Sequence, residues 1–172
     1  SELFERHKAL WVICQSNQIL RESFNPLRGW LFRYFGFALD KNQDGRKQIF
    51  DSKLDDLIAS TPDPELVREL ERTRSFLGAL VDVRWADSLY EQLDAEGRYN
   101  NTFLALIALL KAESLRQPVF FLLEDLHFTD EDSKAFVPRL NRALQASRNS
   151  YPIAILLTSR PQGLADILEE NT

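Results

Sequence analysis

An apolar run that ends directly in two carboxylates is the feature that most constrains the fold of this chain. The segment reads PVFFLLEDLHFTDEDS, in which Glu124 and Asp125 follow the apolar residues 119–123. An unbroken apolar run of this length is typical of a strand buried on both faces, and such strands belong to parallel sheets covered by helices. The sequence therefore predicts an α/β fold with both carboxylates at the carboxyl end of a strand, where open α/β sheets bind ligands.

Adjacent carboxylates at a strand end are suited to Mg²⁺-dependent phosphoryl transfer. One acid can hold the metal through its water shell, while the other orients or deprotonates the attacking water. Glu124 and Asp125 are therefore the candidate metal-binding and catalytic residues. The alternative is that both acids only favour the start of the next helix, where negative charge is stabilised.

A second apolar run, residues 153–157, ends in Thr158, Ser159 and Arg160. It follows the first run by about one βαβ unit, for which roughly 30 residues or more are expected. Its polar end should therefore lie beside the two acids. An arginine there can bind a terminal phosphate through its planar set of donors.

Together, these segments resemble the Walker B and sensor portions of STAND-type AAA ATPases. The shared order is an apolar strand ending in ED, the segment LHFTDEDS, an amphipathic helix, and an apolar strand ending in TSRP. The likeness is closest to the ATPase modules that accompany bacterial adenylate and guanylate cyclases and to Orc1-like AAA domains. Near the N-terminus, ALWVICQS and FNPLRGWL agree with a strand and a helix of that family.

The resemblance implies part of a P-loop NTPase parallel sheet, with flanking helices, a long helical insert, and ATP and Mg²⁺ as ligands. By position, Glu124 would be the metal-side acid and Asp125 the water-side acid, the reverse of the commoner Asp-Glu order. Arg160 resembles the family's sensor arginine, and His127 and Phe128 match its segment after the acids. The remaining residues that the resemblance assigns to the nucleotide site are Thr158, Ser159 and Asp130.

The sequence lacks the GxxxxGK[ST] motif that forms the phosphate cradle in this family. Either a P-loop lies upstream of Ser1 or it was lost, and the absence of Met together with the start SELFERHK favours a fragment. The expected partners are therefore an upstream P-loop segment and attached effector domains. The parent protein is expected to be an ATPase, and this piece alone to be inactive.

Three regions are expected along the chain: a strand region at 1–25, a helical insert at 26–117, and the Walker B and sensor strands at 118–172. Within the last, a helix over about 130–148 should bury Phe136, Leu140 and Leu144 against the sheet. Pro138 falls inside this helix and predicts a kink or a late start. Asp63-Pro64 predicts a cap and a helix start in the insert.

Composition limits the remaining classes. The 172 residues are 44% hydrophobic, which is enough for the core of one soluble domain. The net charge of −5 gives no reason to expect nucleic-acid binding, and no apolar stretch is long enough to span a bilayer. The single cysteine, Cys14, suits a reducing, cytoplasmic environment. Sheet edges left unpaired without a P-loop strand would favour homo-oligomers.

Two other sites are suggested by local patterns. Asp40–Asp51 places Asp40, Asn42, Asp44, Gly45 and Asp51 at positions 1, 3, 5, 6 and 12 of an EF-hand loop, although a polar interhelical turn explains the same residues. Glu124, Asp125, His127 and Asp130 could also be drawn as a metal-hydrolase cluster.

For the whole chain, two functions stay open: part of an ATP-hydrolysing regulatory domain, or a degenerate, non-catalytic ATPase fold that binds proteins.

Overall fold

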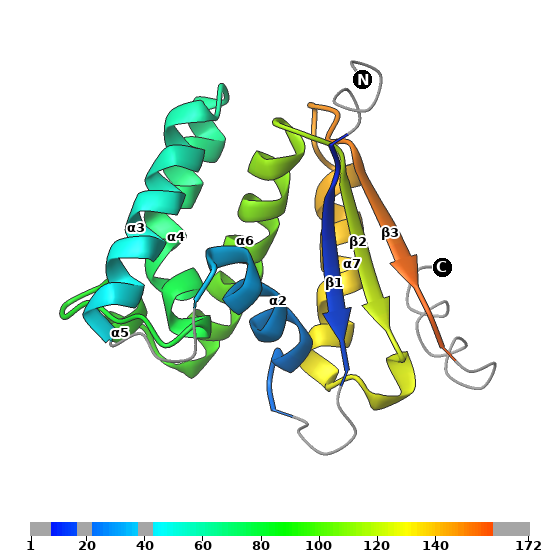
Figure 1. Cartoon of the computed structure of the whole chain (residues 1–172), viewed down its shortest axis with the longest axis horizontal. Helices are drawn as coiled ribbons and strands as arrows, with labels where there is room; N and C mark the ends of the chain where they lie inside the picture. The colour runs from blue at the N-terminus through cyan, green and yellow to red at the C-terminus, as the bar shows by residue number, and fades with distance from the viewer. Residues whose placement is uncertain (1–7, 17–21, 38–42, 160–172) are drawn as a thin grey trace. The chain divides into compact units, whose positions relative to one another are not determined.

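A parallel sheet of three strands forms the centre of one part of the chain. The computed structural model describes residues 8–16, 22–37 and 43–159. Its strands are β1 (Leu10–Gln15), β2 (Val119–Glu124) and β3 (Ile153–Leu157), in the spatial order β1-β2-β3. Both pairings are parallel, as Figure 1 shows. The predicted α/β class with a parallel sheet is therefore confirmed.

The two faces of the sheet differ in how well they are covered. On one face, Phe121 is fully buried and packs against Phe136 of α7 (Glu131–Gln145), with ring centroids 5.5 Å apart. On the other face, Trp11 stacks on Phe120 at 4.7 Å but keeps 51% of its surface exposed. Leu156 of β3 is 41% exposed. The prediction of strands buried on both faces therefore holds for only one face of the sheet.

Helix α7 starts at Glu131 and continues through Pro138, so the predicted late start is wrong, while the alternative, a kink at Pro138, stays a prediction. Proline inside a helix costs about 3 kcal/mol because it removes one hydrogen bond and crowds the preceding turn. Burial of Phe136 and Leu140, both 0% exposed, offsets that cost, and the side chain of Asp130 caps the first turn. Leu144, also predicted to be buried, is only half-buried.

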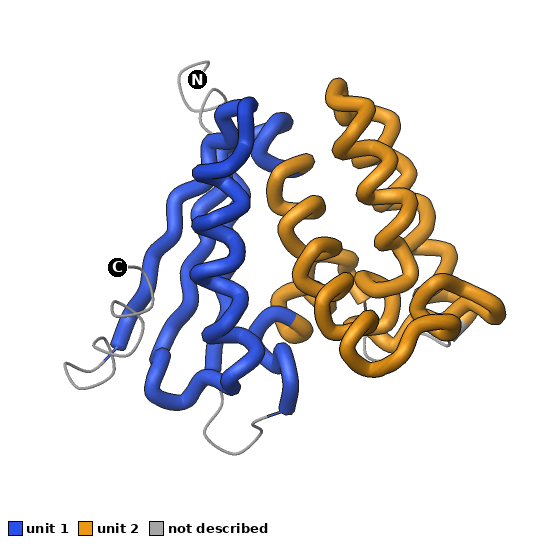
Figure 2. Tube along the Cα trace, turned by 180° about the vertical axis from the view of Figure 1, so that it is seen from behind, with its two compact units in different colours: residues 1–27, 113–172 blue, residues 28–112 orange. Residues whose placement is uncertain are grey.

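The chain divides into two compact units. Unit 1 comprises residues 1–27 and 113–172 and contains the sheet and α7. Unit 2 comprises residues 28–112 and is helical, and Figure 2 colours the two units separately. The helices between β1 and β2 are α2 (Asn25–Phe35), α3 (Gln43–Ser60), α4 (Pro64–Leu80), α5 (Leu89–Gln92) and α6 (Ala95–Ser114). No helix among the described residues is both long and apolar enough to cross a bilayer.

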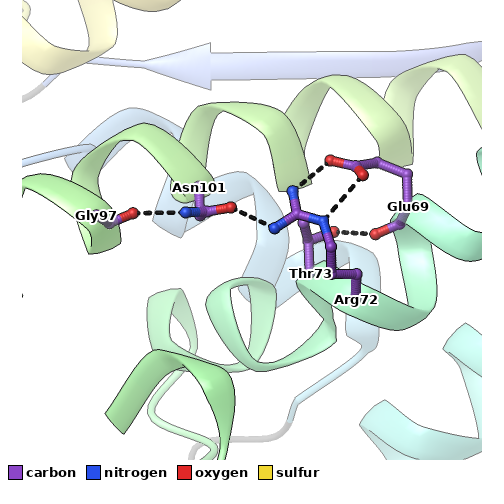
Figure 3. A network of polar contacts seen from close by, with 5 residues as sticks. All are labelled: Glu69, Arg72, Thr73, Gly97 and Asn101. Carbon is purple, nitrogen blue, oxygen red and sulfur yellow. Dashed lines mark hydrogen bonds and ion pairs between the residues drawn. The ribbon is translucent and has the colours of Figure 1, made fainter. Parts of the chain in front are cut away.

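Unit 2 is stabilised by side-chain hydrogen bonds within and between its helices as well as by its apolar core. Arg72 of α4 donates two hydrogen bonds to Glu69, at 2.7 and 3.1 Å, and one to Asn101 of α6 at 2.6 Å (Figure 3). Asn101 in turn donates to the carbonyl of Gly97. The hydrogen bond from Arg72 to Glu69 raises the pKa of the guanidinium. At the start of α4, Asp63 accepts from two backbone N–H groups, so the predicted cap is confirmed.

The EF-hand interpretation of residues 40–51 is wrong, and the alternative of a polar interhelical turn is also wrong for residues 43–51, which are helical. Asp40 and Asn42 lie outside the described residues, but α3 begins at Gln43 and contains Asp44, Gly45 and Asp51. The helix separates Asp44 from Asp51 by about 10 Å along its axis, so the two acids do not surround one ion. Asp51 instead accepts a hydrogen bond from Arg74 at 2.8 Å. The helix is favoured over a calcium loop because its apolar side chains, spaced at helical intervals, become fully buried: Phe50, Leu54 and Leu57.

Gly78 provides a test of packing in unit 2. A Cβ at this position would lie 2.3 Å from a ring carbon of Trp85 and 2.9 Å from the carbonyl oxygen of Val83. We expect Gly78→Ala to lower the free energy of unfolding by about 1–3 kcal/mol in urea denaturation, because the ring of Trp85 and the backbone of Val83 would both have to shift.

Gly29→Ala is the matched control, because an added Cβ at this position would have its nearest neighbouring atom 3.8 Å away. Better helix propensity should then leave the free energy of unfolding unchanged or raise it by up to about 1 kcal/mol. Equal effects at the two glycines would contradict the close packing of Gly78 against Trp85.

Candidate functional site

The carboxyl ends of β2 and β3 bring the two predicted polar segments together. Glu124 is the last residue of β2 and is paired in register with Gln15 of β1. Asp125 follows it and is exposed, while Glu124 is half-buried. Thr158, also exposed, follows β3. The alignment arises because parallel strands in register end at the same edge of the sheet.

Asp125 has a left-handed backbone, with φ 54° and ψ 55°. This conformation costs an ordinary residue about 1–2 kcal/mol, and aspartate and asparagine are among the few non-glycine residues that adopt it. A single 3₁₀ turn, η1 (Leu126–Phe128), follows, and its first hydrogen bond runs from the Phe128 N–H to the Asp125 carbonyl at 2.8 Å. We call residues 124–129 the acidic turn. Its sharp change of direction presents the two acids at the edge of the sheet.

Thr158 holds the acidic turn from the side of β3. Its hydroxyl oxygen accepts a hydrogen bond from the Asp125 N–H at 3.2 Å, and its carbonyl accepts one from the Leu126 N–H at 3.0 Å. The Thr158 N–H donates to the carbonyl of Leu123 at 3.1 Å. Thr158 thus continues the strand pairing beyond β3 and contacts the backbone on both sides of Asp125.

Ser16 and Thr129 hold the acidic turn from the side of β1. The Ser16 hydroxyl donates to the Glu124 carbonyl at 2.9 Å and lies 2.5 Å from the Thr129 hydroxyl. Thr129, which is 3% exposed, also lies 3.5 Å from the Asp125 carbonyl. Together with Thr158, three hydroxyl groups therefore surround the backbone that carries the two acids.

Asp130 caps a helix. One of its carboxylate oxygens accepts from the Ser133 N–H at 2.9 Å and from the Phe24 N–H at 3.0 Å, while the other is buried without a hydrogen-bond partner. Phe24 has a left-handed backbone (φ 58°), which is uncommon for a bulky residue. The side chain of Asp130 thus joins the segment before α2 to the start of α7. Its assignment to nucleotide binding stays a prediction.

The remaining predicted site residues are His127, Ser159 and Arg160. Both ring nitrogens of His127 and the hydroxyl of Ser159 are buried without a hydrogen-bond partner. Arg160 lies outside the described residues. Among the described residues, no three His, Cys, Asp or Glu side chains converge as a metal-binding group. The metal-hydrolase interpretation therefore gains no geometric support, whereas a magnesium ion that keeps most of its waters needs only one or two protein carboxylates.

Ser16 and Thr129 are the residues of this site that sequence reasoning missed. A signal for Ser16 exists, because it follows an apolar strand as Thr158 does. Thr129 lies within the segment LHFTD, directly before the predicted site residue Asp130. The pairing of the two hydroxyls joins positions 113 residues apart and cannot be read from local patterns.

Unit 2 contains a separate open pocket of about 250 Å³. Its two arginines, Arg72 and Arg74, already bind carboxylates of the same unit. They are therefore poorly placed to attract an anionic ligand. The lining residues are Glu71, Arg72, Arg74, Ser75, Trp85, Ser88 and Leu89.

Comparison of the sequence with the known protein families gives no match, and neither do comparisons with curated proteins and with solved structures.

The left-handed backbone of Asp125 predicts an unusual order of stability among variants. Glycine adopts this conformation without a steric penalty, so Asp125→Gly should be more stable than Asp125→Ala by about 1 kcal/mol in urea denaturation. At Asp56, exposed on helix α3, the order should be reversed because alanine favours a right-handed helix over glycine by about 1 kcal/mol. The same order at both positions would contradict the geometry of the acidic turn.

Proposed function

We propose that this chain supplies the acid-bearing and sensor strands of an ATP-binding, ATP-hydrolysing regulatory domain of the STAND/AAA type. The observation that carries the proposal is the contact between the acidic turn and the end of β3, where the Asp125 N–H donates to the Thr158 hydroxyl at 3.2 Å. Two segments that resemble the family's motifs are thus neighbours at the edge of a parallel sheet where ligands commonly bind.

The order of the strands also supports the proposal. β2, which carries the acids, lies between β1 and β3, and within the described residues β3 has a pairing partner on one side only. β3 is apolar throughout, yet its residues are half-buried or exposed, with Leu156 at 41%. Such an apolar strand is typical of a sheet interior. A P-loop strand paired with its outer edge would place a phosphate cradle next to Thr158 and the two acids.

In this function, Glu124 and Asp125 would hold Mg²⁺ through its water shell and orient the attacking water. The hydrogen bonds between the backbone of Glu124 and Asp125 and the hydroxyls of Ser16 and Thr158 would fix the position of both carboxylates before the nucleotide binds. Arg160 would stabilise negative charge on the terminal phosphate. The nucleotide state would then switch an effector attached to the same protein.

A degenerate, non-catalytic ATPase fold that binds proteins is the second candidate. The absence of GxxxxGK[ST] from the sequence favours it, because acids without a phosphate cradle have no nucleotide to act on. In that case the sheet would remain folded and be indifferent to ATP.

The deciding experiment is a fluorescent-ATP titration of the full-length protein with and without Mg²⁺, followed by ATP turnover in Glu124→Gln and Asp125→Asn. We expect saturable Mg²⁺-dependent binding, and loss of turnover by about 10²-fold or more in at least one variant, since a general base contributes about 10²–10⁴-fold. Glu131→Gln and Asp56→Asn are matched controls at exposed acids. Absence of binding by the folded wild-type protein would favour the second candidate, and unchanged turnover in both acid variants would exclude the catalytic assignment.

A further inference from the structure

The hydroxyls of Ser16 and Thr129 make more contacts in the acidic turn than they have protons to donate. Ser16 and Thr129 make three such contacts: Ser16 to the Glu124 carbonyl at 2.9 Å, Ser16 to Thr129 at 2.5 Å, and Thr129 to the Asp125 carbonyl at 3.5 Å. Each hydroxyl has one proton to donate. Only two of the three contacts can therefore be hydrogen bonds at any moment.

The distances indicate which two are formed. A carbonyl only accepts, so the bond to Glu124 uses the Ser16 proton. The Thr129 proton must then choose between Ser16 at 2.5 Å and the Asp125 carbonyl at 3.5 Å, and the first distance is far better for an O–H donor. The result is a directed chain from Thr129 to Ser16 to the Glu124 carbonyl. Donation by Thr129 polarises Ser16 and strengthens its bond to the carbonyl.

This chain acts on the peptide that joins the two acids. The Glu124 carbonyl belongs to the same peptide unit as the Asp125 N–H, which donates to Thr158 on the side of β3. One peptide plane is thus held at both ends, its oxygen by Ser16 after β1 and its N–H by Thr158 after β3. Rotation of this plane would change the backbone of Asp125 and move both carboxylates.

We propose that Ser16 and Thr129 are positioning residues that lock the peptide between Glu124 and Asp125 and so hold both carboxylates in their productive orientation. The expected effect on kcat rests on the proposed function, whereas the expected effect on the backbone of Asp125 does not. Each hydroxyl acts through the backbone of the acids and not on the nucleotide. Its removal should therefore reduce the rate of the chemical step and leave nucleotide affinity in place.

The test compares Ser16→Ala, Thr129→Val and Thr129→Ser in the full-length protein. We expect Ser16→Ala to lower kcat for ATP by at least about tenfold, because a small displacement of a reacting group slows the chemical step strongly. The KM for ATP should stay within about twofold of the wild-type value. Thr129→Val should lower kcat less, since Ser16 can still donate to the carbonyl. Thr129→Ser keeps the proton and should restore the wild-type rate.

Backbone NMR couplings that report a positive φ give a readout that does not depend on turnover. In the wild-type chain, Asp125 should be left-handed, and Ser16→Ala should reduce this population while Thr129→Ser preserves it. Ser60→Ala and Thr102→Val are matched controls, since both hydroxyls donate to carbonyls within helices of unit 2. Neither control should change kcat or the Asp125 couplings.

The outcomes separate this inference from the proposed function. Wild-type kcat and unchanged Asp125 couplings in both Ser16→Ala and Thr129→Val would overturn the positioning role, as would equal losses in Thr129→Ser and Thr129→Val. A wild-type protein without ATP turnover would overturn the proposed function, while the couplings would still decide whether the hydroxyls lock the peptide. If Ser16→Ala does not fold, the Thr129→Val and Thr129→Ser pair decides both questions.

Discussion

The pairing of β2 with a strand on each side is the constraint on which unit 1 depends. β2 shares in-register parallel ladders with β1 and β3, and its residues Phe121 and Leu123 are fully buried. Ser16 and Thr158, which follow the neighbouring strands, also supply hydroxyls that bond to the last residue of β2 and to the residue after it. The pairing of the strands therefore buries the apolar side chains of β2, aligns the ends of the three strands, and sets the backbone geometry of Glu124 and Asp125. If β2 shifted by one residue, the side chains of the strand would move to the opposite face, and Ser16 and Thr158 would no longer lie opposite the peptide between Glu124 and Asp125.

The acidic turn is defined by neutral groups bonded to the backbone. Ser16 and Thr158 act on opposite ends of one peptide, while the carboxylates of Glu124 and Asp125 stay half-buried or exposed. Fixing the backbone leaves the charged groups available to a ligand, whereas an ion pair would occupy them. Asp130 shows the contrary arrangement, because one of its oxygens is already bonded to two N–H groups.

The sequence predicted what short-range patterns determine. Apolar runs located β2 and β3, and Asp63-Pro64 located the start of α4. Prediction failed where a local pattern competes with a longer one: residues 44–51 match a calcium loop by spacing, but they continue into the apolar residues of α3 and are helical. At Pro138, the local rule on proline does not include the packing that keeps α7 intact. The Ser16–Thr129 contact could not be predicted, since it depends on the register between strands that the chain separates widely.

That separation has a consequence for how the chain reaches its native state. β1 and β2 are adjacent in the sheet but are joined by the whole of unit 2. Closing a loop of about a hundred residues costs entropy before any ladder contact can form, so pairing of this kind is slow. Helices α3 and α4, by contrast, are linked by a short connection and can associate early. During synthesis β1 leaves the ribosome about a hundred residues before β2, so the ladder between them can form only after unit 2 has been synthesised.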